Sequence, residues 1–172
     1  MASVATQATE DEDQMARTTV TDLLWGAAAG AAGTTALNVV TYADMALRGR
    51  AASSTPPDTV QALLDRTGLT LPGADEKRGN RLEALGALSG LAAGVGTGVL
   101  LGGLRAMGWR PGSRGTFALT SGVVLVAGNG PMTALGITDP RTWDANAWAT
   151  DLVPHLVYAA VATYVLTNGG GG

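Results

Sequence analysis

The sequence predicts an all-α protein that is integral to a membrane and folds as a bundle of four helices. Four long windows are nearly free of charged residues, and spans are expected at about 22–47, 82–106, 115–137 and 147–167. About 20 apolar residues are enough for a helix to cross the hydrocarbon core of a bilayer. Small residues recur every fourth position in several windows, which is typical of closely packed membrane helices. All four tryptophans lie near predicted helix ends, as an aromatic belt requires: Trp25, Trp109, Trp143 and Trp148.

Composition limits the classes of function. The 172 residues suit one domain, and charged residues make up only 15% of them, so a water-soluble surface would be hard to cover. The net charge of −3 gives no basic footprint for nucleic acid. The chain has no cysteine, which excludes disulfides and thiolate chemistry. One histidine and scattered aspartates do not match a metal set, and cofactor motifs are absent, so we expect neither metal nor cofactor.

Three regions are expected along the chain. Residues 1–20 are polar and acidic, and they predict a disordered tail. Residues 21–168 form the four-helix transmembrane domain. The four glycines at 169–172 have the composition of a flexible linker, and we interpret them as a linker remnant.

The first connection is long and polar, and it contains signals for a short helix. Thr55, Pro56 and Pro57 form a helix start, because proline is tolerated in the first turn. Apolar residues then follow at helical spacing, and Gly68 is a natural end. We therefore expect a short amphipathic helix that lies on the membrane surface or across the mouth of the bundle.

Glycines and other small residues mark the expected packing surfaces of the first two spans. In the second span a glycine recurs every fourth residue, and the first span begins a similar stripe; the predicted helix-packing residues are Gly26, Gly30, Gly86, Gly90, Gly94, Gly98 and Gly102. Glycine lets a second backbone approach closely in lipid. We expect these residues to form a glycine seam, with the second span at the centre of the bundle.

The third and fourth spans carry the features that suggest chemistry. Residues 128–131 read Gly-Asn-Gly-Pro near the middle of the third span, which predicts a kink or an unwound turn. In the fourth span Asp151 lies one turn before His155, the single histidine, so the pair can interact along one helix face.

Polar residues inside spans are costly and usually face the protein interior. We expect a polar pocket or pore lined by Asn38, Asp44, Asn129, Asp151 and His155. The His–Asp pair could relay protons or sense pH. The plainer interpretation is an interfacial pair near a helix start, where the helix dipole favours the aspartate.

An enzyme is not expected. Ser89 beside Gly90 on one span and His155 on another faintly resemble the serine and histidine of intramembrane serine proteases. The first glycine of that Gly-x-Ser-Gly pattern is replaced here by Ala87, and four spans are fewer than that family's core. Ser89 is better interpreted as a hydrogen-bonding residue between helices.

The junction of the third and fourth spans resembles the YagU-like family of small bacterial inner-membrane proteins. The matching residues are Gly136, Ile137, Thr138 and Pro140, followed by Trp148, Asp151, His155, Leu156, Val157 and Tyr158. The glycines of the first span and the Pro-Pro pair of the first connection are also similar. The resemblance implies a small four-helix protein of the bacterial inner membrane, and no defined activity.

The sequence leaves two alternatives for the orientation in the membrane and two for the function. The short arginine-rich loop from Arg105 to Arg114 favours cytoplasmic termini, although the first connection carries more basic residues. The function expected first is an oligomeric channel or transporter for an ion or small solute, because four short helices rarely enclose a pore alone. The alternative is a non-catalytic accessory subunit that docks onto a larger membrane complex. The expected partners are the lipid bilayer and either further copies of the chain or that complex.

Overall fold

The computed structural model describes residues 2–169, and every element in that range is helical. The elements in chain order are α1 (Ala2–Arg48), α2 (Thr55–Thr67), α3 (Asp75–Ala106), α4 (Ser113–Ala134), the short 3-10 turn η1 (Pro140–Thr142) and α5 (Ala145–Gly169). Four of them, α1, α3, α4 and α5, are long and apolar enough to cross a membrane. This confirms the four predicted long apolar helices.

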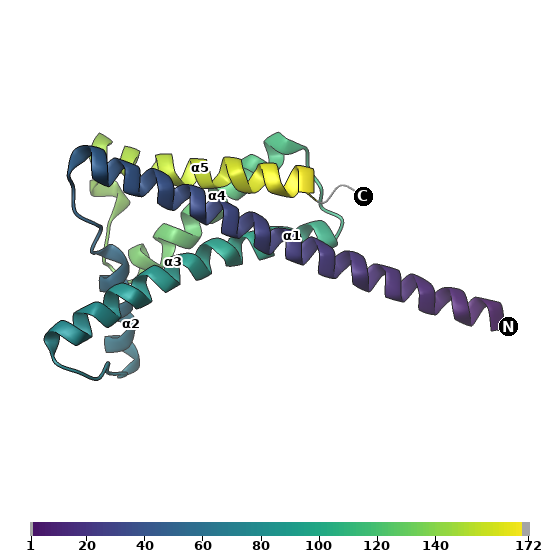
Figure 1. Ribbon diagram of the computed structural model, residues 1–172, viewed down its shortest axis with the longest axis horizontal. Coiled ribbons are helices and arrows are strands. Elements are labelled where there is room, and N and C mark those ends of the chain that lie inside the picture. The colour runs from purple at the N-terminus through teal and green to yellow at the C-terminus, as the bar shows by residue number, and fades with distance from the viewer. Residues whose placement is uncertain (1, 170–172) are drawn as a thin grey trace.

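The first helix begins much earlier than the sequence predicts. The structure continues α1 back to Ala2, where a disordered tail over residues 1–20 is expected. Residues 2–25 contain neither glycine nor proline, so a helix that forms in the apolar window can propagate toward the N-terminus at little cost. The 47 residues of α1 correspond to about 70 Å, and its first half extends beyond the other helices (Figure 1). Residue 1 and residues 170–172 lie outside the described residues, so the predicted linker remnant is represented only by Gly169, the last residue of α5.

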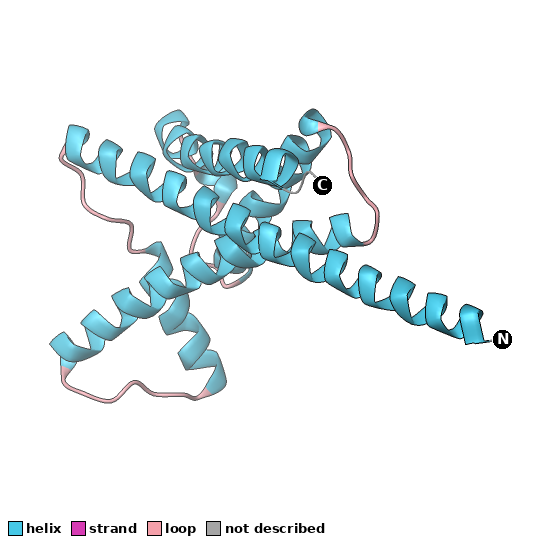
Figure 2. Cartoon of the chain, turned by 45° about the vertical axis from the view of Figure 1, so that its right-hand side comes forward, coloured by secondary structure: helices cyan, strands magenta, loops and turns pink. Residues whose placement is uncertain are grey.

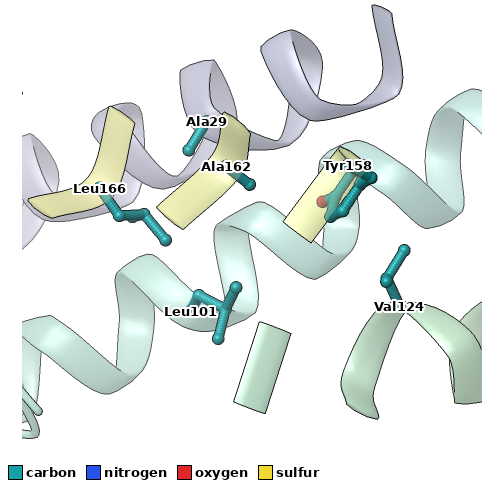
Figure 3. Packing of buried hydrophobic residues seen from close by; sticks show 6 residues of the cluster. All are labelled: Ala29, Leu101, Val124, Tyr158, Ala162 and Leu166. Carbon is teal, nitrogen blue, oxygen red and sulfur yellow. The ribbon is translucent and has the colours of Figure 1, made fainter. Parts of the chain in front are cut away.

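The long helices pack around α1 and α3. α1 makes its most extensive contacts with α3 and α5, whereas α4 packs against α5 and α3, and α2 packs mainly against α3. α1 and α3 cross and then diverge toward the end that carries α2 (Figures 1 and 2). The buried apolar core lies where α1, α3, α4 and α5 meet (Figure 3), and its residues are Ala29, Leu101, Val124, Tyr158, Ala162 and Leu166.

At the crossing of α1 and α3 the two backbones are in contact. A Cβ atom placed on Gly30 would lie 2.7 Å from the carbonyl oxygen of Gly94, and one on Gly98 would lie 2.6 Å from Cα of Gly30. A Cβ on Gly26 would lie 2.9 Å from Cα of Gly102. Real Cβ atoms essentially never come this close, so these positions accept only glycine in the observed packing.

Two predicted packing glycines do not take part in this crossing. Gly86 instead faces α2, where a Cβ would lie 2.9 Å from the nitrogen of Pro57, and a Cβ on Gly90 would meet nothing within 4 Å. The reason is helical geometry: four residues turn the chain by about 400°, so a four-residue repeat rotates by about 40° at each step. Between Gly86 and Gly102 the stripe has therefore moved to another side of α3.

Tyr158 joins α5 to the same crossing. Its ring is fully buried and lies against Gly33 of α1, where a Cβ would come within 2.7 Å of Cδ2 of the ring. Its hydroxyl donates a 2.6 Å hydrogen bond to the carbonyl oxygen of Gly94 on α3. One side chain of α5 thus contacts both α1 and α3.

We expect Tyr158→Phe to lower the free energy of unfolding by about 1–2 kcal/mol, because it deletes a buried hydrogen bond without changing the packed volume. The measurement is denaturant unfolding of the purified protein in detergent. Tyr164→Phe is the matched control, since Tyr164 is exposed. Equal stability of the Tyr158→Phe and Tyr164→Phe variants would contradict the role assigned to this hydroxyl.

α4 does not unwind at residues 128–131, so of the two predicted alternatives, a kink or an unwound turn, the unwound turn is wrong. Pro131 lies inside a continuous helix that runs to Ala134. The turn is closed beyond the proline, where the backbone N–H of Leu135 donates to the carbonyl oxygen of Pro131 at 2.9 Å. Proline removes its own N–H donor and crowds the carbonyl of residue i−4, and this segment is nevertheless helical where α4 packs against α5.

The short helix in the first connection has the predicted ends. α2 begins at Thr55 with Pro56 and Pro57 in its first turn. It ends before Gly68, which adopts a left-handed conformation with φ of 71° and whose N–H bonds to the carbonyl oxygen of Leu64. This conformation is the one that glycine adopts without strain. α2 covers α3 near Gly86 and brings the α1–α2 connection beside the candidate site described below.

Candidate functional site

A cavity of about 500 Å³ lies at the end of the bundle that carries the α1–α2 and α4–α5 connections. Its walls come from the C-terminal part of α1, the α1–α2 connection, the first turn of α2, the end of α4, the α4–α5 connection and the first turns of α5. Apolar side chains form part of the wall, including Leu37, Met132 and Trp143. This volume is within the usual range of small-molecule pockets, roughly 300–1,000 Å³.

Three of the five predicted pocket residues meet in this cavity. Asn129 of α4 donates from Nδ2 to Oδ2 of Asp151 on α5 at 3.0 Å. Nδ1 of His155 lies 2.7 Å from the backbone oxygen of Asp151 and 3.5 Å from its Oδ1. The side chains of Asp151 and His155 are only 16% and 17% exposed. The helical spacing of four in α5 and the packing of α4 against α5 bring these groups together.

The surroundings of His155 define which ring nitrogen can bind a ligand. A backbone carbonyl only accepts hydrogen bonds, so Nδ1 must carry the proton in the contact with Asp151. In the neutral ring Nε2 is then the acceptor. Nε2 faces Gly128 of α4, where a Cβ would lie 2.9 Å from it. Any larger residue at position 128 would collide with Nε2, so glycine at this position makes room for the His155 ring.

The outer part of the cavity is lined by Arg48 and Arg50, which the pocket prediction does not include. Arg48 bridges α1 and α5, because Nη1 donates to Oδ1 of Asn146 at 2.6 Å and Nη2 donates to Oγ1 of Thr150 at 3.2 Å. Nε of Arg48 and Nε of Arg50 both lie against the carboxylate of Asp44, at 3.0 and 2.5 Å. Two arginines and one aspartate leave one positive charge here.

The two remaining predicted residues lie elsewhere. Asp44 is not among the described lining residues, and it takes part only by holding Arg48 and Arg50. Asn38 is half-buried on α1, and the described lining residues of that helix include Leu37 and Thr41 in its place. The helical period explains this result, because Asn38 is turned by about 100° from Leu37.

The connection between α4 and α5 is ordered by local contacts at the cavity. The guanidinium of Arg141 is hydrogen-bonded to the carboxylate of Asp139, and this contact lowers the pKa of Asp139 below its usual range. Nε1 of Trp143 donates to Oγ1 of Thr138 at 2.9 Å. The rings of Trp143 and Trp148 meet edge to face with centroids 5.1 Å apart. These contacts fix Trp143 in the cavity wall.

A second charged cluster lies at the opposite end of the helices. The side chain of Asp22 on α1 is only 5% exposed, and its carboxylate lies 2.7 Å from Nη2 of Arg110 and 3.9 Å from Nε of Arg105. The sequence offers a signal for this cluster. Asp22 lies at the start of the first charge-free window and Arg105 at the end of the second, and two consecutive spans run in opposite directions, so these two residues lie at the same end of the helices. Asp22 and Asp44 are separated along α1 by about 33 Å, close to the roughly 30 Å hydrocarbon core of a bilayer.

Ser89 and His155 lie in different surroundings. The hydroxyl of Ser89 on α3 donates to the carbonyl oxygen of Gly86 in its own helix at 2.7 Å. His155 lines the cavity, and Ser89 is not among the described residues that do so. The hydrogen bond to its own helix also differs from the interhelical role that the sequence suggests for Ser89.

These features define a class, a small multi-pass membrane protein with four candidate spans and a polar cavity near one end of them. Comparison with known proteins adds no closer relationship: no family model, no curated protein and no solved structure matches the chain.

Proposed function

We propose that this membrane protein moves a small polar solute or ion, and that the cavity between α1, α4 and α5 is its binding site. The observation that carries the proposal is the hydrogen-bonded chain of Asn129, Asp151 and His155 on the wall of a 500 Å³ cavity. Ionisable groups inside candidate spans are costly and commonly mark solute or proton pathways. Their side chains remain partly exposed to the cavity, so a solute can reach them.

The packing favours a carrier over an open pore within one chain. At the crossing the glycine contacts of α1 and α3 bring the backbones together, and the Tyr158 ring fills the adjacent space. A carrier binds its solute in a cavity that opens to one side at a time. Movement of α4 against α1, α3 and α5 would open the other side. The glycine contacts at the crossing and the Tyr158 side chain would hold α1, α3 and α5 as a unit.

The test is solute-induced swelling of proteoliposomes, followed by light scattering with a panel of amino acids, amines, carboxylates and sugars. We expect at least one solute to enter faster than into protein-free liposomes. Asp151→Asn should lower that rate by about tenfold or more, because a buried carboxylate that binds the solute is lost. Asp65→Asn is the matched control, since Asp65 is exposed on α2 and lies outside the cavity lining. Rates equal to those of empty liposomes across the whole panel would refute the proposal.

The alternative function is that of an accessory subunit without transport. The specific feature that favours it is the first half of α1, which extends away from the other helices and offers a free helix for a partner (Figure 1). A second protein that co-purifies in stoichiometric amount in mild detergent, together with no solute entry, would support this alternative over transport.

Four further properties belong to the same proposal. The protein is a non-enzymatic member of the YagU-like family, and the residues around Asp151 and His155 support this assignment. It resides in the bacterial inner membrane with both termini in the cytoplasm, as the arginine-rich loop from Arg105 to Arg114 favours. It associates with further copies of itself through lipid-facing helix surfaces. α2 is amphipathic and lies at the membrane surface.

A further inference from the structure

The inner part of the cavity is rich in hydrogen-bond acceptors. Asp151 presents Oδ1, which lies 3.5 Å from the histidine ring and so is beyond a normal hydrogen bond. Asn129 uses Nδ2 on Asp151, so its Oδ1 remains an acceptor, and the His155 ring with its proton on Nδ1 offers Nε2 as an acceptor when it is neutral. Pro154 lies inside α5 and has no N–H, so the carbonyl of Thr150 lacks its usual helical donor. Acceptors and one negative charge favour a ligand that donates hydrogen bonds and carries a positive charge.

The outer part of the cavity has the opposite character. Asp44 neutralises one of the two arginines, which leaves one positive charge. The three kinds of nitrogen in Arg48 are occupied by Asp44, Asn146 and Thr150. Arg50 donates from Nε to Asp44 and from Nη1 to the carbonyl oxygen of Ala51, so Nη2 remains available as a donor. This end favours an acidic group on the ligand.

We propose that the ligand of this cavity is a small zwitterion of the amino-acid type. Its ammonium group binds at Asp151, Asn129 and His155, and its carboxylate binds at Arg50. Trp143 in the wall contacts the carbon chain between the two charged groups. This inference names the solute class for the transport function proposed above, and it rests on that function only in treating the cavity as the solute site.

The test is isothermal titration calorimetry of the full chain in detergent with three zwitterions, glycine, β-alanine and γ-aminobutyrate. Each is compared with the amine and the carboxylate of the same carbon skeleton, such as n-butylammonium and butyrate. We expect at least one zwitterion to bind about tenfold or more tightly than its two matched single-charge compounds, because each of these leaves one charged end of the site unpaired. The proposal would be overturned if each of the three zwitterions bound no more tightly than its matched carboxylate or its matched amine.

Two variants test the orientation of the ligand. Asp151→Asn should weaken binding of the zwitterion and the amine and leave the carboxylate unaffected, whereas Arg50→Gln should weaken binding of the zwitterion and the carboxylate. Asp65→Asn and Arg66→Gln, both exposed on α2, serve as controls. Circular dichroism melting in the same detergent checks that each variant is folded. The inference fails if neither variant changes zwitterion affinity or if no zwitterion binds; entry of a different solute in the swelling assay would then leave the transport function standing.

Discussion

Gly98→Ala is expected to destabilise the protein by about 3 kcal/mol or more. The added Cβ would lie 2.5 Å from the nitrogen and 2.6 Å from Cα of Gly30. These neighbours are backbone atoms, so no side chain can rotate away and the two helices must move apart. Overpacking of a well-packed interior typically costs about 1–3 kcal/mol, and rigid neighbours place this site at the upper end. Denaturant unfolding in detergent, followed by circular dichroism, measures the loss.

Gly90→Ala is the matched control on the same helix. A Cβ on Gly90 would meet nothing within 4 Å, and alanine is a better helix former than glycine by about 1 kcal/mol. We expect this variant to be as stable as the wild type or slightly more stable. Equal destabilisation by Gly98→Ala and Gly90→Ala would show that the α1–α3 contact does not hold the fold together.

Asp22→Asn is expected to cost about 3 kcal/mol. The carboxylate is buried between Arg105 and Arg110, and the side chain of Arg105 is only 12% exposed. Removing one member of a buried ion pair leaves an uncompensated charge, which typically costs about 3–5 kcal/mol. We take the lower end because Arg110 is in contact with solvent. The same unfolding assay measures the effect.

The control for Asp22→Asn is Asp139→Asn, which breaks the exposed ion pair between Asp139 and Arg141. Exposed pairs contribute little to stability, so this variant should unfold like the wild type. A double variant that combines Asp22→Asn with Arg105→Gln should recover part of the lost stability, since it also removes the uncompensated charge. Failure of Asp22→Asn to destabilise the protein would contradict the assignment of this cluster as a structural anchor.

The sequence predicts the long helices well, because apolar windows of this length leave few alternatives. It predicts their ends less well. α1 extends to Ala2 because helix propagation continues through residues without glycine or proline, which a charge-based boundary does not detect. The glycine stripe of α3 is divided between two partners, because a repeat of four residues does not match a helical period of 3.6. Gly94, Gly98 and Gly102 therefore reach α1, whereas Gly86 reaches α2.

The polar site is predicted only in part, because topology places some of its residues whereas the path of a connection and the rotation of a helix decide the others. Asn129, Asp151 and His155 can be brought together from topology, since the end of α4 and the start of α5 must lie at the same side. The contributions of Arg48 and Arg50 depend on the path of the α1–α2 connection and on the side-chain contacts of Asp44. Asn38 fails as a lining residue because one position along a helix changes its direction by about 100°. Spacing along the chain does not contain this information.

We expect Asp22 and Asp44 to mark opposite faces of a bilayer, with four spans between them. The absence of cysteine allows single cysteines to be introduced at Ser53 in the α1–α2 connection, at Ser113 where α4 begins, and at Ser121 within α4. The measurement is labelling with a membrane-impermeant maleimide before and after permeabilisation of the cells.

We predict that Ser53→Cys and Ser113→Cys react from opposite sides of the membrane. With cytoplasmic termini, Ser53→Cys reacts in intact cells and Ser113→Cys reacts only after permeabilisation, while Ser121→Cys reacts slowly in both conditions. Reaction of Ser53→Cys and Ser113→Cys from the same side, or reaction of Ser121→Cys as fast as the other two, would contradict the four-span arrangement.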